Sequence, residues 1–306
     1  MESKLKETHP AATAYSTGGK PRTRRVPWLT LAFLFPSLVS FSLFKYIPLA
    51  YAAFMSFFDF NFMSPPGRFV GFDNYRLLFQ SSYFWTAFYN TFVLAFLMLI
   101  MTFWVPILQA LLLTGISRGN TYFRFFYLLP SAVPAIANYV LWKWMYHPDH
   151  GFLNQVLQSV GLPPLLWLND PSLAKIAIVL PGVLGGGMSL LIYFSALQGM
   201  SGEMQESAKI DGAGPWRRLF SILLPNMKFV IGINFLGFLS GAFLAFDHIY
   251  VMTAGGPANS TKVLTLLVFE NAFQQTRYGY ASAISMIVFA LITLLSYAQI
   301  RISQGK

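Results

Sequence analysis

Long apolar stretches, separated by short polar segments, run through most of the chain. Each stretch is long enough for the roughly 20 residues that a helix needs to cross a bilayer core. We expect every stretch to be helical, because lipid offers no partner to the unpaired amides of an open strand. The six predicted spans are Trp28–Ile47, Trp85–Leu113, Phe125–Trp144, Ile176–Leu197, Phe229–Met252 and Tyr280–Ile300. The pattern therefore predicts an all-α polytopic membrane protein with six transmembrane helices.

Composition agrees with a membrane protein and removes several classes of chemistry. Hydrophobic residues make up 55% of the chain and charged residues only 10%, whereas about a quarter of an ordinary soluble chain is charged. The chain has no cysteine, which excludes disulfides, thiolate metal sites and a cysteine nucleophile. We interpret His147 and His150 as solvated loop residues rather than metal ligands. No phosphate-binding Gly-x(4)-Gly-Lys-Ser/Thr run exists, so we expect no nucleotide site and no cofactor in this chain.

The basic residues indicate an orientation in the membrane. The formal net charge is +10. If the N-terminus is cytoplasmic and the chain crosses six times, 14 of the 21 lysines and arginines fall on the inner side. This asymmetry is the one that the positive-inside rule describes. We predict a multi-pass protein of the cytoplasmic (inner) membrane with both termini in the cytoplasm, in contact with membrane lipid and not with nucleic acid.

Changes in polarity divide the chain into three parts. Residues 1–26 are polar and lack apolar periodicity, which predicts a disordered cytoplasmic tail. Residues 27–84 hold the first transmembrane helix and an outer interfacial segment. The apolar run there continues too far for a signal peptide, so we interpret it as an uncleaved span. Residues 85–306 hold the other five spans and a polar loop at 199–228.

The loop at 199–228 has the period of two short amphipathic helices. Gly212-Ala213-Gly214 is predicted to end the first helix, because glycine commonly follows a helix end. Pro215 is expected at the first position of the second helix, where proline is tolerated. We expect Pro225 to stop this second helix before the fifth span.

The same loop carries the most specific motif of the sequence. Residues 206–225 follow the pattern Glu-Ala-Ala-x(3)-Gly-x(9)-Ile-x-Leu-Pro, with Ser207 in place of the first alanine. The six matching positions are Glu206, Ala208, Gly212, Ile222, Leu224 and Pro225. The loop closely resembles the cytoplasmic coupling-helix loop of permease subunits in binding-protein-dependent ABC importers. Segments 142–144, 149–154, 246–257 and 279–283 resemble the sugar branch of that family, the maltose and glycerol-3-phosphate type.

The resemblance, which covers roughly residues 28–300, implies a role and a set of partners. The chain would be a non-catalytic permease that forms half of the translocation pathway for a sugar or oligosaccharide. A second, different permease, two ATPase subunits and an extracytoplasmic solute-binding protein would complete the importer. The residues that the resemblance places at the ATPase are Glu206, Ser207, Ala208, Asp211, Gly212, Ala213 and Pro225. Arg217 and Arg218 are open to two interpretations, pairing with partner carboxylates or lipid phosphate, or simple positive-inside anchoring.

The resemblance also places substrate contacts on the fourth and fifth spans. The corresponding positions are Leu184, Gly185, Met188, Phe238, Gly241, Ala242 and Ala245. These positions lack side chains that hydrogen-bond a sugar hydroxyl, so direct sugar recognition by this subunit stays open. Helix packing is an equal alternative at each of them, because small residues also let helix backbones approach closely.

Three other functions are compatible with a polytopic helical protein. Within the importer interpretation, the alternative solute is another polar molecule such as glycerol-3-phosphate. An ion-coupled secondary transporter would need an ionisable residue at mid-membrane, whereas the charges here lie mostly near span ends. A structural or enzyme-anchoring membrane protein would lack the ATPase partners altogether.

Overall fold

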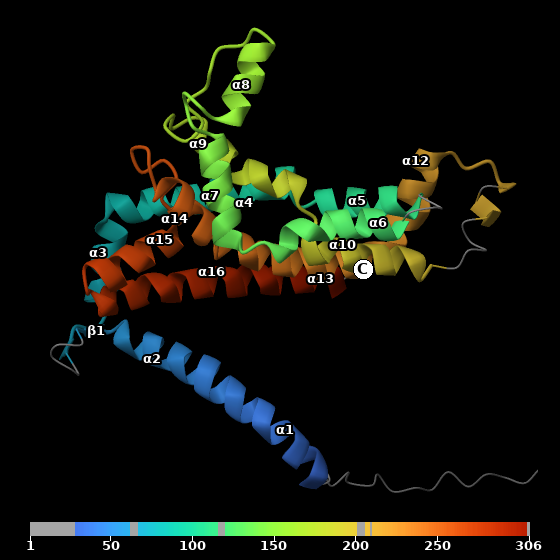
Figure 1. Ribbon diagram of the computed structural model, residues 1–306. Coiled ribbons are helices and arrows are strands. Elements are labelled where there is room, and N and C mark those ends of the chain that lie inside the picture. Colours follow the sequence, from blue (N-terminus) through green and yellow to red (C-terminus); the bar gives the residue numbers. More distant parts are fainter. Residues whose placement is uncertain (1–27, 62–66, 116–119, 201–205, 209, 305–306) are drawn as a thin grey trace, which may run out of the picture. The chain divides into compact units, whose positions relative to one another are not determined.

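The computed structural model describes residues 28–61, 67–115, 120–200, 206–208 and 210–304 (Figure 1). The predicted disordered tail, residues 1–26, lies outside the described residues. The chain divides by its internal contacts into two units, residues 1–49 and 50–306. Within the described residues the chain is mostly helical, which agrees with the all-α prediction.

The first unit contributes a helix that continues into the second. Its parts are α1 (Trp28–Phe41), a π-helical turn η1 (Ser42–Tyr46) and α2 (Ile47–Met55). The stretch Ala32–Met55 is apolar and long enough to cross a membrane. Neither Pro36 nor Pro48 ends the helix. In η1 the Ile47 N–H already donates to the Ser42 carbonyl, and this wider hydrogen-bond register precedes the proline.

A small hairpin and a surface helix follow. Strands β1 (Phe58–Asp59) and β2 (Arg68–Phe69) pair antiparallel, and α3 spans Asp73–Gln80. The Asn74 side chain is buried and its Nδ2 donates to the carbonyls of Ser56 and Phe58 at 2.9 and 3.0 Å. This pairing satisfies backbone acceptors that the short hairpin leaves open. Helix α3 lies in the part of the chain, residues 27–84, for which the sequence predicted an interfacial segment after the first span.

Three further helical runs of the second unit are long and apolar enough to span a membrane. The first run, Ser82–Thr114, consists of α4 (Ser82–Met101) and α5 (Val105–Thr114). The second, Pro215–Thr253, consists of α12 (Pro215–Arg218), η4 (Leu219–Leu223), α13 (Leu224–Phe243) and α14 (Asp247–Thr253). The third, Tyr278–Ile302, lies within α16 (Tyr278–Gln304). A bent pair adds a possible fifth span in the second half of the chain. It joins α9 (Ala174–Val179) and η3 (Leu180–Leu184) to α10 (Gly187–Gln198) at an angle of 46°.

The predicted third span, Phe125–Trp144, is interrupted. The chain forms α6 (Asn120–Leu128), a 3₁₀ turn η2 (Leu129–Ala132) and α7 (Ala135–Met145). Pro134 has an extended ψ of 132° and precedes α7, because proline cannot donate the amide hydrogen bond that a continuous helix needs there. By length and composition the described residues thus contain four spans, or five with the bent pair. The count of six stays a prediction.

The remaining short helices are α8 (Phe152–Ser159), α15 (Leu264–Phe269) and the π-helical η5 (Glu270–Gln274). The core of the second unit is built where long helices cross. Phe103 and Ile107 from α4–α5 pack with Leu190 and Tyr193 of α10 and Met227 of α13. In lipid such contacts are held by close packing rather than by the hydrophobic effect.

Candidate functional site

The loop after α10 forms the predicted helix and glycine elbow. Residues 206–208 and 210 are helical. The helix ends when the Asp211 N–H donates to the Ser207 carbonyl and the Ala213 N–H donates to the Ala208 carbonyl, both at 2.9 Å. Gly212 lies between them with φ +72°, the left-handed conformation that glycine adopts without strain at a helix end. The prediction that glycine ends the first helix of the loop is confirmed.

The second helix begins as predicted but does not end as predicted. Gly214 precedes α12, and Pro215 occupies its first turn. The expectation that Pro225 stops this helix is wrong, because α12, η4 and α13 form one uninterrupted run. In η4 the Leu224 N–H donates to the Leu219 carbonyl, five residues back. This π turn shifts the hydrogen-bond register just before Pro225, so the missing amide of the proline does not break the helix.

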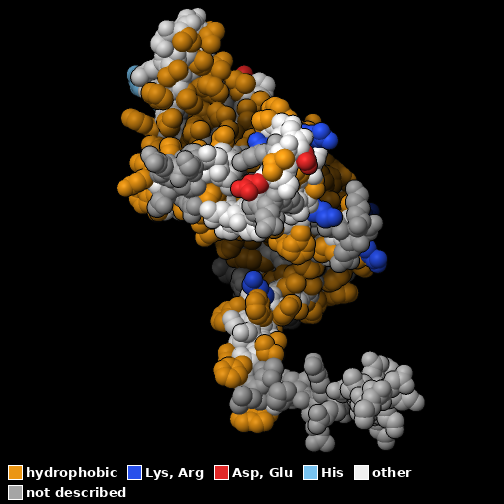
Figure 2. All heavy atoms as spheres, turned by 90° about the vertical axis from the view of Figure 1, so that its right-hand side faces the viewer, with side chains coloured by type: hydrophobic (Ala, Val, Ile, Leu, Met, Phe, Trp, Pro, Cys, Tyr) orange, Lys and Arg blue, Asp and Glu red, His pale blue; other side chains and the backbone are white. Residues whose placement is uncertain are grey.

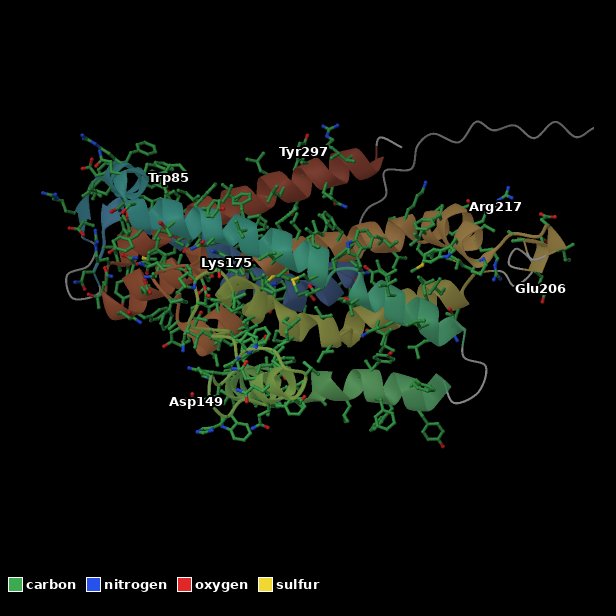
Figure 3. All side chains as sticks on the ribbon, turned by 90° about the horizontal axis from the view of Figure 1, so that it is seen from above. Trp85, Asp149, Lys175, Glu206, Arg217 and Tyr297 are labelled. Carbon is green, nitrogen blue, oxygen red and sulfur yellow. The ribbon has the colours of Figure 1, made fainter. Side chains whose placement is uncertain are left out.

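The loop end carries charges together with exposed apolar side chains. Figure 2 looks onto the end with α12 and shows acidic and basic side chains gathered there. Glu206 and Arg217 lie at this end in Figure 3. Ile210 is 85% exposed, and Trp216 stacks on Phe220 with ring centroids 6.2 Å apart, both rings being exposed. The sequence motif did not single out Ile210, although a large apolar side chain at an exposed helix end indicates a contact surface.

The residues predicted to dock on an ATPase differ in accessibility. Glu206, Ser207, Asp211, Gly212 and Pro225 are exposed. Ala213 is half-buried and Ala208 is buried. Ala208 is therefore the least accessible of the residues predicted to dock on an ATPase.

The seven residues predicted to line a pathway separate into two groups. Leu184, Gly185, Met188 and Gly241 lie open on the surface of α10, α13 and the segment before α10. Ala242 and Ala245 are buried, at 6% and 9% exposure, in contacts between helices. Phe238 is partly buried against Phe103, with ring centroids 5.2 Å apart.

A groove lies between α10 and α13, and Phe238 is the one predicted pathway residue that lines it. It has a volume of about 500 Å³ and is lined by Ser189, Ile192, Val230, Ile233, Asn234, Gly237 and Phe238. Ile233, Gly237 and Gly241 follow one another at i and i+4, so they fall on one face of α13. Sequence reasoning found Gly241 but missed the rest of this face, because apolar residues cover all sides of the helix.

The break before α10 is built around three glycines and one buried amide. Gly187 has φ +50°, and a side chain at Gly186 would overlap Oε1 of Gln109 on α5. Gln109 is itself buried, and this oxygen has no hydrogen-bond partner in the described part of the chain. The oxygen faces the start of α10, where helix N–H groups are unsatisfied and positive charge accumulates. Only glycine leaves room for this arrangement.

His147 and Asp170 make local hydrogen bonds within their own loops. The backbone N–H groups of Asp149 and His150 point at His147 Nδ1, both at 3.3 Å. Asp170 accepts hydrogen bonds from the Ser172 hydroxyl at 2.6 Å and the Ser172 N–H at 2.8 Å. These bonds favour the charged carboxylate and lower the pKa of Asp170. Among the described residues, no group of three or more metal-ligating side chains comes together.

Known proteins of one family resemble this chain over most of its length. The family described as "Binding-protein-dependent transport system inner membrane component" matches residues 111–305. The diacetylchitobiose uptake system permease protein NgcF of Streptomyces coelicolor is 34% identical, over 95% of this chain and 89% of its own. The probable ABC transporter permease protein YurN of Bacillus subtilis is 32% identical, over 90% and 95%.

Solved structures add a match in three dimensions. A chain of a bacterial ABC transporter involved in the import of the acidic polysaccharide alginate has a TM-score of 0.80 and 25% identity, with 91% of this chain and 96% of that chain covered. Family, relatives and fold agree. The chain belongs to the inner membrane components of binding-protein-dependent transport systems.

Proposed function

We propose that this chain is one permease half of an ATP-driven importer of a sugar or oligosaccharide. It works with a second permease, two ATPase subunits and an extracytoplasmic solute-binding protein, and it does no covalent chemistry itself. The observation that carries the proposal is the unbroken helical run of α12, η4 and α13, residues 215–243. One end of this run adjoins the Gly212 elbow, and its middle lines the groove.

The elbow is the contact with an ATPase. Glu206, Ser207 and Asp211 offer polar groups at the exposed face, while Ile210 and Trp216 offer apolar surface. ATP-driven movement of the ATPase displaces the elbow. Because α12, η4 and α13 are continuous, the displacement is carried along the helix axis to the groove.

The open faces of α10 and α13 form this chain's wall of the translocation pathway. Leu184, Gly185, Met188 and Gly241 belong to that wall, whereas Ala242 and Ala245 hold it in place by packing. The wall is mainly apolar, with Ser189 and Asn234 as its polar side chains. A smooth wall of this kind lets a polar solute pass without strong binding, and recognition of the sugar falls mainly to the binding protein.

The topology follows from the coupling assignment. The elbow is cytoplasmic, six spans cross the inner membrane, and both termini lie inside, which agrees with the distribution of basic residues. Residues 1–26 form a cytoplasmic tail, residues 27–84 the first span with its outer segment, and residues 85–306 the permease domain with the coupling loop 199–228.

Uptake by cells that express the complete importer tests the proposal. Labelled saccharides, including diacetylchitobiose, and glycerol-3-phosphate are supplied with the ATPase partner either intact or inactivated at its nucleotide site. We expect saccharide uptake only with the intact ATPase and insensitivity to collapse of ion gradients. Uptake that survives ATPase inactivation and disappears with an ion gradient would show a secondary transporter instead. Uptake of glycerol-3-phosphate but of no saccharide would refute the sugar assignment.

A further inference from the structure

A polar cavity lies at the end of the second unit where α3 leads into α4 and where α16 begins. Its volume is about 510 Å³. It is lined by Ser81, Tyr83, Asn259, Lys262, Leu267, Glu270, Asn271, Gln275, Arg277 and Tyr280. The cavity shares no lining residue with the groove of α10 and α13. Trp85, near the start of α4, and Arg217 lie at opposite ends in Figure 3, so the cavity is remote from the elbow.

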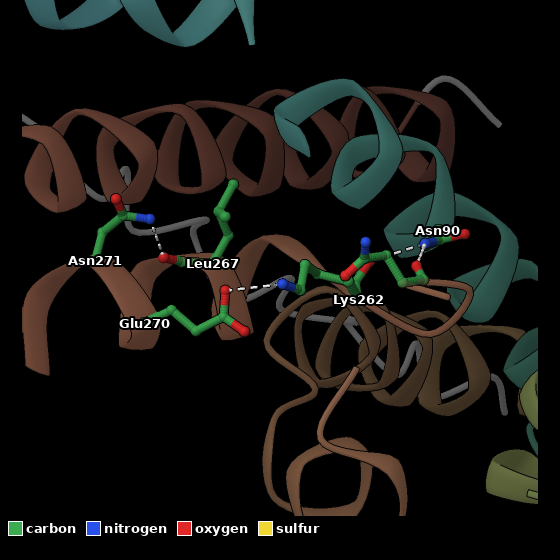
Figure 4. Close-up of polar contacts among 6 residues, drawn as sticks. Asn90, Lys262, Leu267, Glu270 and Asn271 are labelled. Atoms are coloured by element: carbon green, nitrogen blue, oxygen red, sulfur yellow. Dashed lines mark hydrogen bonds and ion pairs between the residues drawn. The ribbon is translucent and has the colours of Figure 1, made fainter. Parts of the chain in front are cut away.

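The walls of this outer cavity are fixed by hydrogen bonds between distant segments. Asn90 Nδ2 donates to the carbonyls of Asn259 and Lys262 at 2.9 and 3.0 Å (Figure 4). Asn271 Nδ2 donates to the Leu267 carbonyl at 2.8 Å. The Asn90 bonds hold α4 and the loop at 259–262 together beside the cavity, and the Asn271 bond is local to the α15–η5 helix. A wall fixed in this way is the preorganisation that a binding site requires.

The charges in the outer cavity leave one cation available. Lys262 Nζ lies 3.0 Å from Glu270 Oε2, and both side chains are largely buried. These two charges compensate each other. The Arg277 guanidinium lies over the Tyr280 ring at 4.6 Å. Within the part of the chain that the structure describes, no carboxylate lies within ion-pair distance of Arg277. A ligand therefore meets a net positive cavity.

We propose that the outer cavity binds a saccharide unit and prefers one that carries a carboxylate. Amide, hydroxyl and charged groups match the hydroxyls of a sugar, and the exposed ring of Tyr83 adds aromatic surface. The volume fits a small ligand, since binding pockets of about 300–1,000 Å³ hold molecules of this size. Arg277 supplies the bidentate donors that a carboxylate accepts best. The inference rests on the proposed function for its ligand class, and it adds an entry site outside the groove.

Binding to the full chain in lipid nanodiscs tests the outer cavity. Glucuronic acid and glucose serve as probes, and saturation-transfer NMR titrations give their affinities. Arg277→Gln should weaken glucuronic acid at least tenfold and glucose much less. Tyr83→Ala, at an exposed position, should weaken both sugars. Arg76→Gln is the matched control, because it removes the same charge from an exposed position on α3 outside the cavity.

The outcomes separate this site from the groove and from the proposed function. Gly241→Trp, which fills the open face of α13, should leave glucuronic acid binding unchanged. Equal losses in Arg277→Gln and Arg76→Gln, or loss of binding in Gly241→Trp, would overturn the proposal, as would absence of saturable glucuronic acid binding to the wild-type chain. If saccharide uptake is normal in that last case, the outer cavity alone is refuted. Absence of all saccharide uptake refutes the function.

Discussion

Replacement of Gly212 by alanine isolates the conformational demand of the coupling elbow. Gly212 has φ +72°, and no atom of the described residues lies within 4 Å of the position that a Cβ would take. A side chain therefore adds no clash within this chain, and the cost is that of the left-handed backbone alone. For an L-residue this cost is about 1–2 kcal/mol. The equilibrium constant for forming the elbow conformation should fall about 5- to 30-fold, since 1.4 kcal/mol corresponds to a factor of ten.

The assay measures how much ATPase subunit co-purifies with the chain and how fast the importer takes up substrate. Gly212→Ala should insert normally in the membrane but lower both quantities. Gly214→Ala is the matched control, because Gly214 has φ −61° and equally open surroundings. Gly212→Asn should recover part of the loss, since asparagine tolerates the left-handed region better than alanine.

Gly212→Leu distinguishes backbone strain from close approach of the partner. It carries the same backbone cost as alanine and adds bulk at the exposed elbow, so we expect loss of ATPase binding and of uptake. If leucine abolishes coupling while alanine is harmless, the partner's surface and not the φ angle requires glycine. Normal complex recovery and normal transport in the leucine variant would refute the role of the elbow.

Three further predictions test topology, the helix break and the packing of α13. In this cysteine-free chain, Ser207→Cys should be labelled only from the cytoplasm and Asp149→Cys only from outside, and outside labelling of residue 207 in sealed cells would contradict the orientation. The Gly186→Ala side chain should overlap the buried Gln109 amide, and this overpacking should cost about 1–3 kcal/mol and lower the yield of complex. Gly185→Ala is a harmless control, because nothing in the described residues lies within 4 Å of its Cβ position. Equal yields of the two variants would refute the contact. Ala245→Trp should likewise reduce assembly, since Ala245 is 9% exposed, whereas an assembled but transport-blocked complex would place this residue in the pathway instead.

Local chemistry made the coupling loop predictable. Glycine after a helix end and proline in a first turn are rules that depend on a few neighbouring residues, and Gly212 and Pro215 follow them. The same reasoning gave a wrong prediction for Pro225, because the π turn that accommodates this proline depends on a hydrogen bond from the Leu224 N–H to the Leu219 carbonyl. Nothing in the residue types around a proline shows whether the preceding turn widens or the helix ends.

The pathway was harder to predict because apolar periodicity disappears inside a bilayer. A helix that faces lipid on one side and other helices on the rest is hydrophobic all round. The family resemblance implied substrate contacts at both Gly241 and Ala245, four residues apart, yet the first lies open and the second is buried. The contacts that each residue makes in the folded protein decide this difference in exposure. Thr265, twenty residues further along the chain, donates to the Ala245 carbonyl at 2.6 Å, and no sequence pattern indicates that contact.

The continuous helix also explains how a loop movement can reach the groove. The continuous part, residues 215–243, holds 29 residues (4 in α12, 5 in η4 and 20 in α13) and at 1.5 Å per residue extends over about 40 Å. Phe235 and Phe238 of α13 pack on Phe103 of the α4–α5 run between the two ends. Aromatic contacts in lipid hold by shape and dispersion, and they permit small rotations without breaking a hydrogen bond. Because these aromatic residues lie among the groove-lining residues of α13, a pivot there would turn the groove face while the loop end moves, as the proposed coupling requires.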